Sequence, residues 1–195
     1  MKKILITAFF LFLTAFSGTS QANHWILDPD HSEVRFEIQH IFSTISGRFS
    51  DFKGELEFNP ENLGTSRFDF SVAVKSINTL NNKRDTHLRS KDFFDAGNFP
   101  VMTFTSSGIT HLKDNLYALE GKMKIKDVTK PLKIQFFYYG PKQHPFDDKS
   151  MVAGFSTSFV LNRLDYHVGN GKFLSLGVVG DAVRVEISLE GLRKK

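Results

Sequence analysis

The stretch "VRFEIQH", residues 34–40, alternates apolar and polar side chains, and this alternation decides the fold class of the whole chain. The apolar side chains of Phe36 and Ile38 fall on one side of an extended chain, whereas those of Arg35 and Glu37 fall on the other. Such a pattern is typical of an antiparallel strand that packs one face on a core and exposes the other to water.

Seven further stretches of the chain show the same period of two. They lie at residues 52–58, 68–74, 101–106, 117–125, 132–140, 154–161 and 182–191. Between them, the segment 140–150 is typical of a polar hairpin connection, and 162–180 of a mobile loop or a short irregular strand. Eight such strands fit either a β-sandwich or a closed up-and-down barrel. Closure removes the unpaired sheet edges, and an eight-stranded barrel has room for its own side chains or for one slim ligand.

Phenylalanine, with 21 residues in the chain, supplies much of the apolar face of these strands. The alternation predicts that the following side chains point into the barrel and line a ligand-binding cavity: Phe36, Ile38, His40, Phe70, Val72, Phe104, Met123, Phe136, Phe155, Phe159 and Val185. A solid aromatic core has the same alternation, so the pattern alone leaves both alternatives open. His40 ends an apolar face, where a hydrogen-bonded structural histidine is more common than a metal ligand.

Residues 1–22 have the features of a secretory signal peptide: two lysines, an apolar run at residues 4–16, and the small-x-small ending Ser20-Gln21-Ala22. The apolar run is too short for a membrane-spanning helix, which needs about 20 residues. We therefore expect cleavage after Ala22 and export, and a Gram-negative periplasm fits best. Because the chain has no cysteine, the remaining domain, residues 23–195, has to be held together by its core rather than by disulfides.

The composition disfavours several functional classes. The formal charge is +4, and the basic residues lack the clustering that nucleic acid requires, so we expect no nucleic-acid partner. The chain has neither a cysteine nor a G-x-S-x-G nucleophile motif, and His31 and His40 lack the close spacing of a zinc site. We therefore expect no catalytic residue, no metal and no cofactor, and an enzyme is the minority interpretation.

The segment 81–100, "NNKRDTHLRSKDFFDAGNFP", interrupts the alternation with charged residues followed by adjacent aromatic residues. Its charges recur three and four residues apart, which predicts a short helical insertion near residues 82–94. We expect this insertion to form a lid over one end of the barrel, held by an ion pair between Arg84 and Asp85. The residues expected at this mouth are Arg84, Asp85, His87, Leu88, Phe93 and Phe94.

A second interpretation gives the same segment a direct binding role. Cations such as Arg84 and His87 then hold an anionic or polar head group, while the aromatic side chains contact its tail. A lipid-modifying enzyme would also need an acid–base pair at this mouth, and only Arg84, Asp85 and His87 come close to supplying one.

Several motifs of the chain are specific enough to indicate a family. They are Arg84-Asp85 with His87-Leu88 and Ser90, then Asp92-Phe93 and Pro100, and the turn "KDVTKP" at residues 126–131. With these motifs the chain closely resembles the YceI-like family of periplasmic polyisoprenoid-binding proteins, from about residue 25 to 191. The resemblance implies an extended, lipocalin-like antiparallel barrel of eight strands. It also implies an elongated cavity that takes a long isoprenoid chain, such as a polyprenyl phosphate or the tail of a respiratory quinone.

One motif departs from the family's pattern. Where the family commonly has Arg-x-Asp-Phe-Gly, the chain has Arg163-Leu164-Asp165-Tyr166-His167. The resemblance implies that Arg163 and Asp165 pair structurally, and the histidine in place of glycine predicts a stiffer turn after them.

These observations together predict one all-β domain, an extended eight-stranded antiparallel lipocalin-like barrel with a short helical insertion near residues 82–94. We expect it to bind an isoprenoid or other long-chain amphiphilic lipid, for carriage, sequestration or storage. We also expect transient contact with the membrane and a monomer or a homodimer. The alternatives are a periplasmic stress or structural protein with a filled barrel and, less favoured, a lipid-modifying enzyme.

Overall fold

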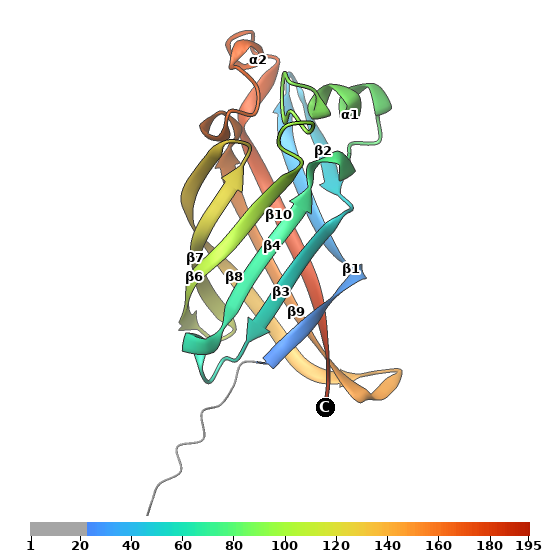
Figure 1. Cartoon of the computed structure of the whole chain (residues 1–195), viewed down its shortest axis with the longest axis vertical. Helices are drawn as coiled ribbons and strands as arrows, with labels where there is room; N and C mark the ends of the chain where they lie inside the picture. Colours follow the sequence, from blue (N-terminus) through green and yellow to red (C-terminus); the bar gives the residue numbers. More distant parts are fainter. Residues whose placement is uncertain (1–22) are drawn as a thin grey trace, which may run out of the picture.

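The computed structural model describes residues 23–195, so the expected signal peptide at residues 1–22 lies outside the described residues. The described chain forms an elongated β-barrel whose strands run obliquely along its long axis (Figure 1). Helices α1 (Asn82–Arg89) and α2 (Lys172–Ser175) lie at one end, which we call the mouth end. The C-terminus lies at the other, which we call the closed end. None of the helices within the described residues has the length and apolar character that crossing a membrane requires.

Eight antiparallel strands close the barrel in the order β1-β3-β4-β6-β7-β8-β9-β10, and β10 pairs back to β1. Their bounds are β1 Asn23–His40, β3 Phe52–Phe58, β4 Arg67–Ala73, β6 Val101–Lys113, β7 Leu116–Ile125, β8 Val128–His144, β9 Asp147–Asn162 and β10 Val179–Lys194. Each of the eight stretches with alternating sequence corresponds to one of these strands. The predicted closed barrel of eight antiparallel strands is thus confirmed.

Two further strands extend the wall at the mouth end. β2 (Ser43–Phe49) pairs with residues 34–40 of β1, and β5 (Ile77–Asn78) pairs with β2. β2 was not predicted, because Gly47 interrupts the apolar face formed by Ile45 and Phe49. That interruption has a packing reason, since Gly47 lies opposite Phe36 and a Cβ at Gly47 would come within 2.4 Å of the Phe36 ring.

Two connecting segments differ from the prediction. The segment 140–150, expected as a hairpin connection, belongs largely to β8 and β9, and only residues 145–146 lie between the two strands. The segment 162–180, expected as a mobile loop or an irregular strand, contains the 3-10 helix η3 (Arg163–Tyr166) and then α2 before β10 begins. Two other short 3-10 helices, η1 (Leu63–Thr65) and η2 (Val74–Ser76), flank β4.

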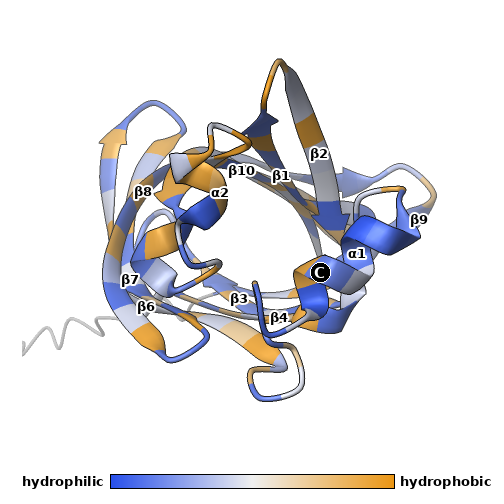
Figure 2. Ribbon diagram, turned by 90° about the horizontal axis from the view of Figure 1, so that it is seen from above, coloured by the Kyte–Doolittle hydropathy of each residue, from blue (hydrophilic) through white to orange (hydrophobic). Residues whose placement is uncertain are grey.

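Helix α1 begins after Asn81, whose side-chain oxygen accepts a hydrogen bond of 3.0 Å from the backbone N–H of Arg84. The residues that follow the helix, 90–94, form turns. The insertion predicted near residues 82–94 is therefore helical in its first part and consists of turns in its second. Figure 2 shows α1 and α2 on opposite sides of the ring of strands.

Aromatic side chains fill the barrel at its closed end. The ring of Phe58 packs against five other rings at centroid distances between 4.8 and 5.8 Å: those of Phe68, Tyr117, Phe136, Tyr138 and Phe155. Trp25 and Leu56 are fully buried in the same cluster. The alternative of a solid aromatic core thus describes this end of the barrel.

Gly54 in β3 allows a test of the packing between neighbouring strands. It lies opposite Phe70, and a Cβ on Gly54 would come within 2.2 Å of the Phe70 ring. We expect Gly54→Ala to push that ring from its rotamer and to lower the free energy of unfolding by about 1–3 kcal/mol, as measured by chemical denaturation. Gly108→Ala is the control, because nothing lies within 4 Å of its Cβ, and it should be neutral or slightly stabilising. Equal losses from both substitutions would contradict the register of β3 and β4.

Candidate functional site

The interior at the mouth end is hollow. Its cavity has a volume of about 630 Å³, which lies within the range of roughly 300–1,000 Å³ typical of small-molecule sites. The inward faces of the strands form the wall, and α1, the turns after it, η3 and the residues around α2 form the roof. Most of the wall is aromatic or aliphatic, so the cavity suits an apolar guest.

All side chains predicted to point inward lie on this wall: Phe36, Ile38, His40, Phe70, Val72, Phe104, Met123, Phe136, Phe155, Phe159 and Val185. Their contact with a ligand stays a prediction. Other wall residues on the same strand faces, such as Phe52 and Leu132, carry the same period-two signal, although they were not among the residues predicted. Roof residues such as Tyr166, Val168 and Phe173 had no such signal, because they lie on or beside short helical turns.

Polar side chains border the cavity near its mouth. They are His40, Thr79, Asn81, Lys83, Arg84 and His87. His40 was expected to be a hydrogen-bonded structural histidine, but within the described residues no hydrogen bond or ion pair involves its ring. His40 lies on the cavity wall.

Arg84 and Asp85 do not form the expected ion pair with each other. Asp85, only 4% exposed, accepts hydrogen bonds from the backbone N–H of Thr79 at 2.9 Å and from its hydroxyl at 2.5 Å. Arg84 donates to the hydroxyl and to the carbonyl oxygen of the same Thr79, both at 2.7 Å. Both side chains thus hold Thr79, three residues before α1 begins at Asn82. Arg84 lies on the cavity wall, whereas Asp85 does not. The cause is local: adjacent helical residues point in different directions, so each finds its own partner.

Aromatic rings join the two sides of the mouth. Phe93, from the turns after α1, stacks on Phe173 of α2 with centroids 5.8 Å apart and an interplanar angle of 14°. The ring of His87 meets Phe93 edge-on at 5.0 Å, and Phe94 meets Phe49 of β2 edge-on at 6.0 Å. Leu88 packs against the same group. The hydrophobic residues predicted at the mouth therefore form its roof, as expected for a lid.

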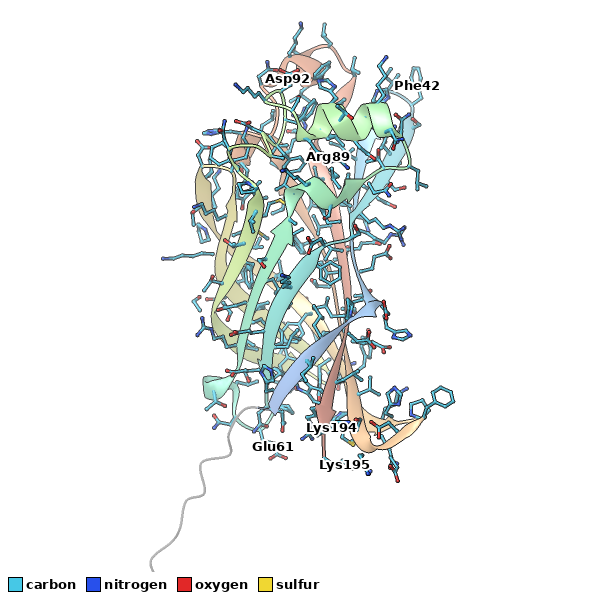
Figure 3. The ribbon with its side chains drawn as sticks, turned by 45° about the vertical axis from the view of Figure 1, so that its right-hand side comes forward. Phe42, Glu61, Arg89, Asp92, Lys194 and Lys195 are labelled. Carbon is cyan, nitrogen blue, oxygen red and sulfur yellow. The ribbon has the colours of Figure 1, made fainter. Side chains whose placement is uncertain are left out.

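Basic side chains fix this roof through main-chain carbonyl groups. Lys126, in the turn between β7 and β8, donates to the carbonyl oxygen of Phe93 at 2.8 Å and to that of His167 at 2.6 Å. Arg89, labelled in Figure 3, donates to the carbonyl oxygen of Ile77 at 2.6 Å. Such charge-assisted bonds hold the segment around α1 to the barrel.

The family model described as the YceI-like domain matches residues 25–191. The chain belongs to the YceI-like family. Protein YceI of Escherichia coli O157:H7 is 30% identical to it over 198 residues, and UPF0312 protein VVA0736 of Vibrio vulnificus (strain YJ016) is 29% identical over 199 residues. Both alignments cover 100% of this chain and of the relative.

Solved structures share the barrel of this YceI-like chain. BcnA of Burkholderia cenocepacia superposes with a TM-score of 0.77 at 22% identity, covering 84% of this chain and 98% of BcnA. A Campylobacter jejuni YceI protein gives 0.70 at 26% identity and covers 81% and 91%. A polyisoprenoid-binding domain from Saccharophagus degradans, implicated in plant cell wall breakdown, gives 0.65 at 15% identity and covers 90% and 100%. At 15% and 22% identity these likenesses show the fold.

In this YceI-like chain, Arg163 of η3 is a buried cation that bonds to main-chain carbonyl groups. Its guanidinium, 6% exposed, donates to the carbonyl oxygens of Val168 at 2.8 Å, Gly180 at 2.7 Å and Val179 at 3.3 Å. Burial lowers the pKa of Arg163, because the protein interior disfavours its charge. The side chain thereby ties the loop before α2 to the start of β10.

The pairing of Arg163 with Asp165, which the resemblance implied, is wrong. Asp165 pairs instead with Lys130 at 3.2 Å. His167, at the position of the family's glycine, has the left-handed φ of 55° that a glycine adopts without cost. Its ring lies 3.0 Å from a carboxylate oxygen of Asp127, and this hydrogen bond lowers the pKa of Asp127. The turn thus keeps the left-handed backbone conformation that a glycine would adopt there. The contact between His167 and Asp127 takes the place of glycine's conformational freedom.

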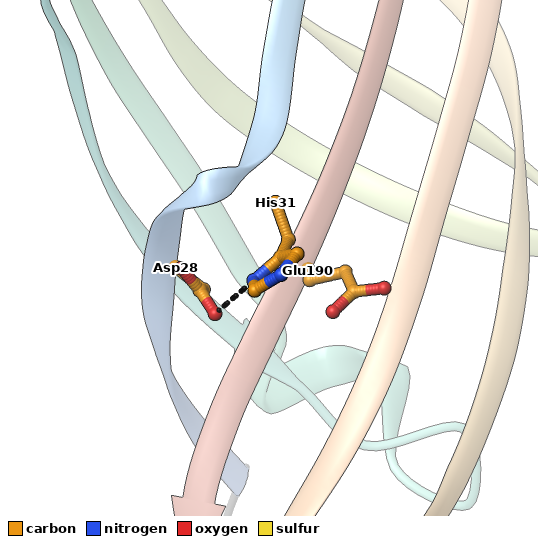
Figure 4. A group of neighbouring side chains, drawn as sticks. All are labelled: Asp28, His31 and Glu190. Carbon is orange, nitrogen blue, oxygen red and sulfur yellow. Dashed lines mark hydrogen bonds and ion pairs between the residues drawn. The ribbon is translucent and has the colours of Figure 1, made fainter.

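A second group of polar residues lies outside the cavity, on the barrel's outer surface (Figure 4). Asp28 and His31 of β1 and Glu190 of β10 bring one ligand atom each to within 4.8 Å of one another. His31 hydrogen-bonds to Asp28 at 2.9 Å, which raises the pKa of His31 and lowers that of Asp28. One imidazole and two carboxylates could hold a divalent cation. No sequence pattern marks this group, because Glu190 is far from Asp28 and His31 along the chain.

The hydrogen bonds at Thr79 predict a stability effect. Asp85→Ala leaves the buried amide and hydroxyl of Thr79 without their acceptor, so we expect a loss of about 1–3 kcal/mol in the free energy of unfolding. Asp92→Ala is the matched control on the same segment, because Asp92 pairs with His87 while 71% of its side chain is exposed. It should cost at most about 1 kcal/mol. Chemical denaturation measures both, and an Asp85 variant as stable as the control would overturn this assignment.

Two glycines near η3 test the role of Arg163. Gly169 and Gly171 both have left-handed φ angles, 86° and 81°, so an alanine strains the backbone equally at either position. A Cβ at Gly169 would lie 2.4 Å from the Arg163 guanidinium, whereas at Gly171 the nearest atom is 3.9 Å away. We expect Gly169→Ala to be less stable than Gly171→Ala by about 1–3 kcal/mol, because the displaced guanidinium loses carbonyl partners. Indistinguishable melting curves would refute this role.

Proposed function

We propose that this YceI-like protein binds a long-chain isoprenoid or a similar amphiphilic lipid in the cavity at its mouth end, for carriage, sequestration or storage. One observation carries the proposal: the barrel encloses about 630 Å³ behind an apolar wall, with polar side chains near the entrance. The neighbour from Saccharophagus degradans, described as a polyisoprenoid-binding domain, supports the same class of ligand.

The distribution of polar groups sets the direction of the ligand. The tail points toward the aromatic cluster of the closed end, where the wall residues are Phe68, Phe136 and Phe155. The head group lies at the mouth, beside the donors of Lys83 and Arg84. Cationic donors at this place fit an anionic head group such as a phosphate, or a polar one such as a quinone ring.

The energetics favour a long branched tail. Each methylene group moved from water into an apolar site is worth about 0.8 kcal/mol, so a few isoprene units offset the cost of immobilising the ligand. The rigid rings of the wall, for example Phe36 and Phe70, offer polarizable surfaces to the double bonds of an isoprenoid. Binding therefore needs little polar chemistry inside the cavity.

The same reasoning favours a binding protein over an enzyme. The basic groups of the roof, Lys126, Arg89 and Arg163, donate to main-chain carbonyl groups and act as structural donors. Export to the periplasm, with cleavage after Ala22, is part of the proposal and rests on the sequence features of residues 1–22. A carrier in that compartment would hold an apolar tail away from water between membranes.

Filling the cavity tests this function. Val185→Trp puts an indole into the cavity wall, so we expect its affinity for a polyprenyl phosphate to fall by at least about tenfold. Val160→Trp is the control, because Val160 lies on β9 with 61% of its surface exposed. Native mass spectrometry of each variant with the lipid gives the affinities, and melting curves show that both are folded.

The outcomes separate the alternatives. A stoichiometric lipid that co-purifies with the wild-type protein from its own host, and is lost with Val185→Trp alone, supports the carrier. If the wild-type protein binds no lipid in either experiment, the proposal fails and a structural or stress-related role takes its place. Conversion of the lipid into a product would support the lipid-modifying enzyme.

A further inference from the structure

Large apolar side chains extend into solvent around the mouth of the cavity. Phe42, between β1 and β2, is 98% exposed, Leu80, just before α1, is 91% exposed, and Leu176, just after α2, is 63% exposed. Figure 3 shows Phe42 at the mouth end, beside α1. Among the described residues, only Phe146 is as exposed as the first two, at 94%, and it lies in the turn between β8 and β9.

The backbone of two of these loops makes the apolar side chains more unusual. A two-residue hairpin favours Asn-Gly, because its residues adopt positive φ, yet here the pair is Ile41-Phe42 and Ile41 has a φ of 49°. Leu80 has a φ of 59°. A β-branched residue in the left-handed region is a genuine outlier. Both loops therefore depart from local folding preferences at the same end of the barrel, and such departures are expected at functional sites.

Lysines stand among these apolar side chains. Lys83 and Lys91, from α1 and the turn after it, and Lys172, from α2, are all exposed. Within the described residues no carboxylate lies within ion-pair distance of them. The four acidic residues of the segments 79–99 and 163–178 each have another partner: Asp85 with Thr79, Asp92 with His87, Asp95 with Asn98 and Asp165 with Lys130. With six lysines and arginines against these four aspartates, the two segments together have a formal charge of +2.

We propose that this rim, made of Phe42, Leu80, Leu176, Lys83, Lys91 and Lys172, docks on an anionic lipid membrane. The three apolar side chains enter the boundary between head groups and acyl chains, while the lysines meet the lipid phosphates. The mouth then faces the bilayer, so an apolar tail passes from membrane to cavity without crossing water. This last step rests on the proposed function, whereas the docking itself does not.

Vesicle binding tests the rim directly. The protein, purified from cells that express the full chain, is sedimented with vesicles of phosphatidylcholine alone or with an equal part of phosphatidylglycerol. We expect clear binding to the anionic vesicles and little to the neutral ones. The variant Phe42→Ser/Leu80→Ser/Leu176→Ser should lose at least about tenfold in partition coefficient. Phe146→Ser, the matched change at the opposite end, should bind like the wild-type protein.

Two triple lysine variants test how much the positive charge contributes to membrane binding. Lys83→Gln/Lys91→Gln/Lys172→Gln should abolish the preference for anionic vesicles. The triple Lys113→Gln/Lys142→Gln/Lys149→Gln, which removes as much charge at the β6–β7 and β8–β9 turns of the closed end, should keep it. Equal losses from both lysine triples, or unchanged binding by the serine triple, would overturn the proposal.

Two further readouts keep this inference separate from the proposed function. Lipid retention in vesicle-free solution should be unchanged in the serine triple, because none of its residues lies on the cavity wall. Vesicle binding by a wild-type protein that retains no lipid would support the docking and refute the carrier. Light scattering gives the oligomeric state, and a wild-type dimer that the serine triple converts to a monomer would show that the rim binds a second copy instead of a membrane.

Discussion

The pairing of β1 with β10 is the constraint on which the rest of the structure depends. It runs from Ile26 opposite Leu192 to His40 opposite Val179 and turns an open sheet into a closed barrel. After closure, every second side chain of eight strands faces the same interior, so the size of those side chains decides whether a level of the barrel is filled or hollow. Interlocking rings around Phe58 fill the closed end, and the mouth end stays open inside.

Glycines on the inward faces also help to decide how much of the interior the side chains fill. Each of Gly47 and Gly54 lies opposite a phenylalanine, whose ring covers the place where a Cβ would be. A bulky ring thus lies flat along the wall rather than across the cavity. The wall can therefore be aromatic and the interior still hold a guest, which a simple count of phenylalanines in the sequence does not reveal.

Much of the barrel and its wall could be predicted, because strand alternation has a strict period and every inward residue of a closed barrel shares one interior. Ile38, Phe104 and Val185 are on the wall for this reason alone. The partners of charged side chains could not be predicted in this way. Arg84 and Arg163 bind main-chain carbonyl groups, and every residue has one, so no sequence pattern marks the acceptor.

The roof of the cavity also could not be predicted from the period of the sequence. Phe93 and Phe173 are far apart in the chain, and their stacking depends on where two short helical segments end. The short helix near residues 82–94 could be predicted because its charges broke the alternation, whereas the ion pair expected to hold it could not. The segment around α2 contains no comparable signal, and its glycines alone suggested a loop.

The buried floor of Trp25, Leu56 and Phe58 has a consequence for any guest of the barrel. These side chains fill the closed end, so the tail of the proposed lipid would enter at the mouth and reach a fixed depth. In that case the aromatic cluster would set the length of tail that the barrel holds. A tail shorter than this depth would leave unfilled space at the closed end, and a longer one would keep its surplus units, together with the head group, outside the mouth.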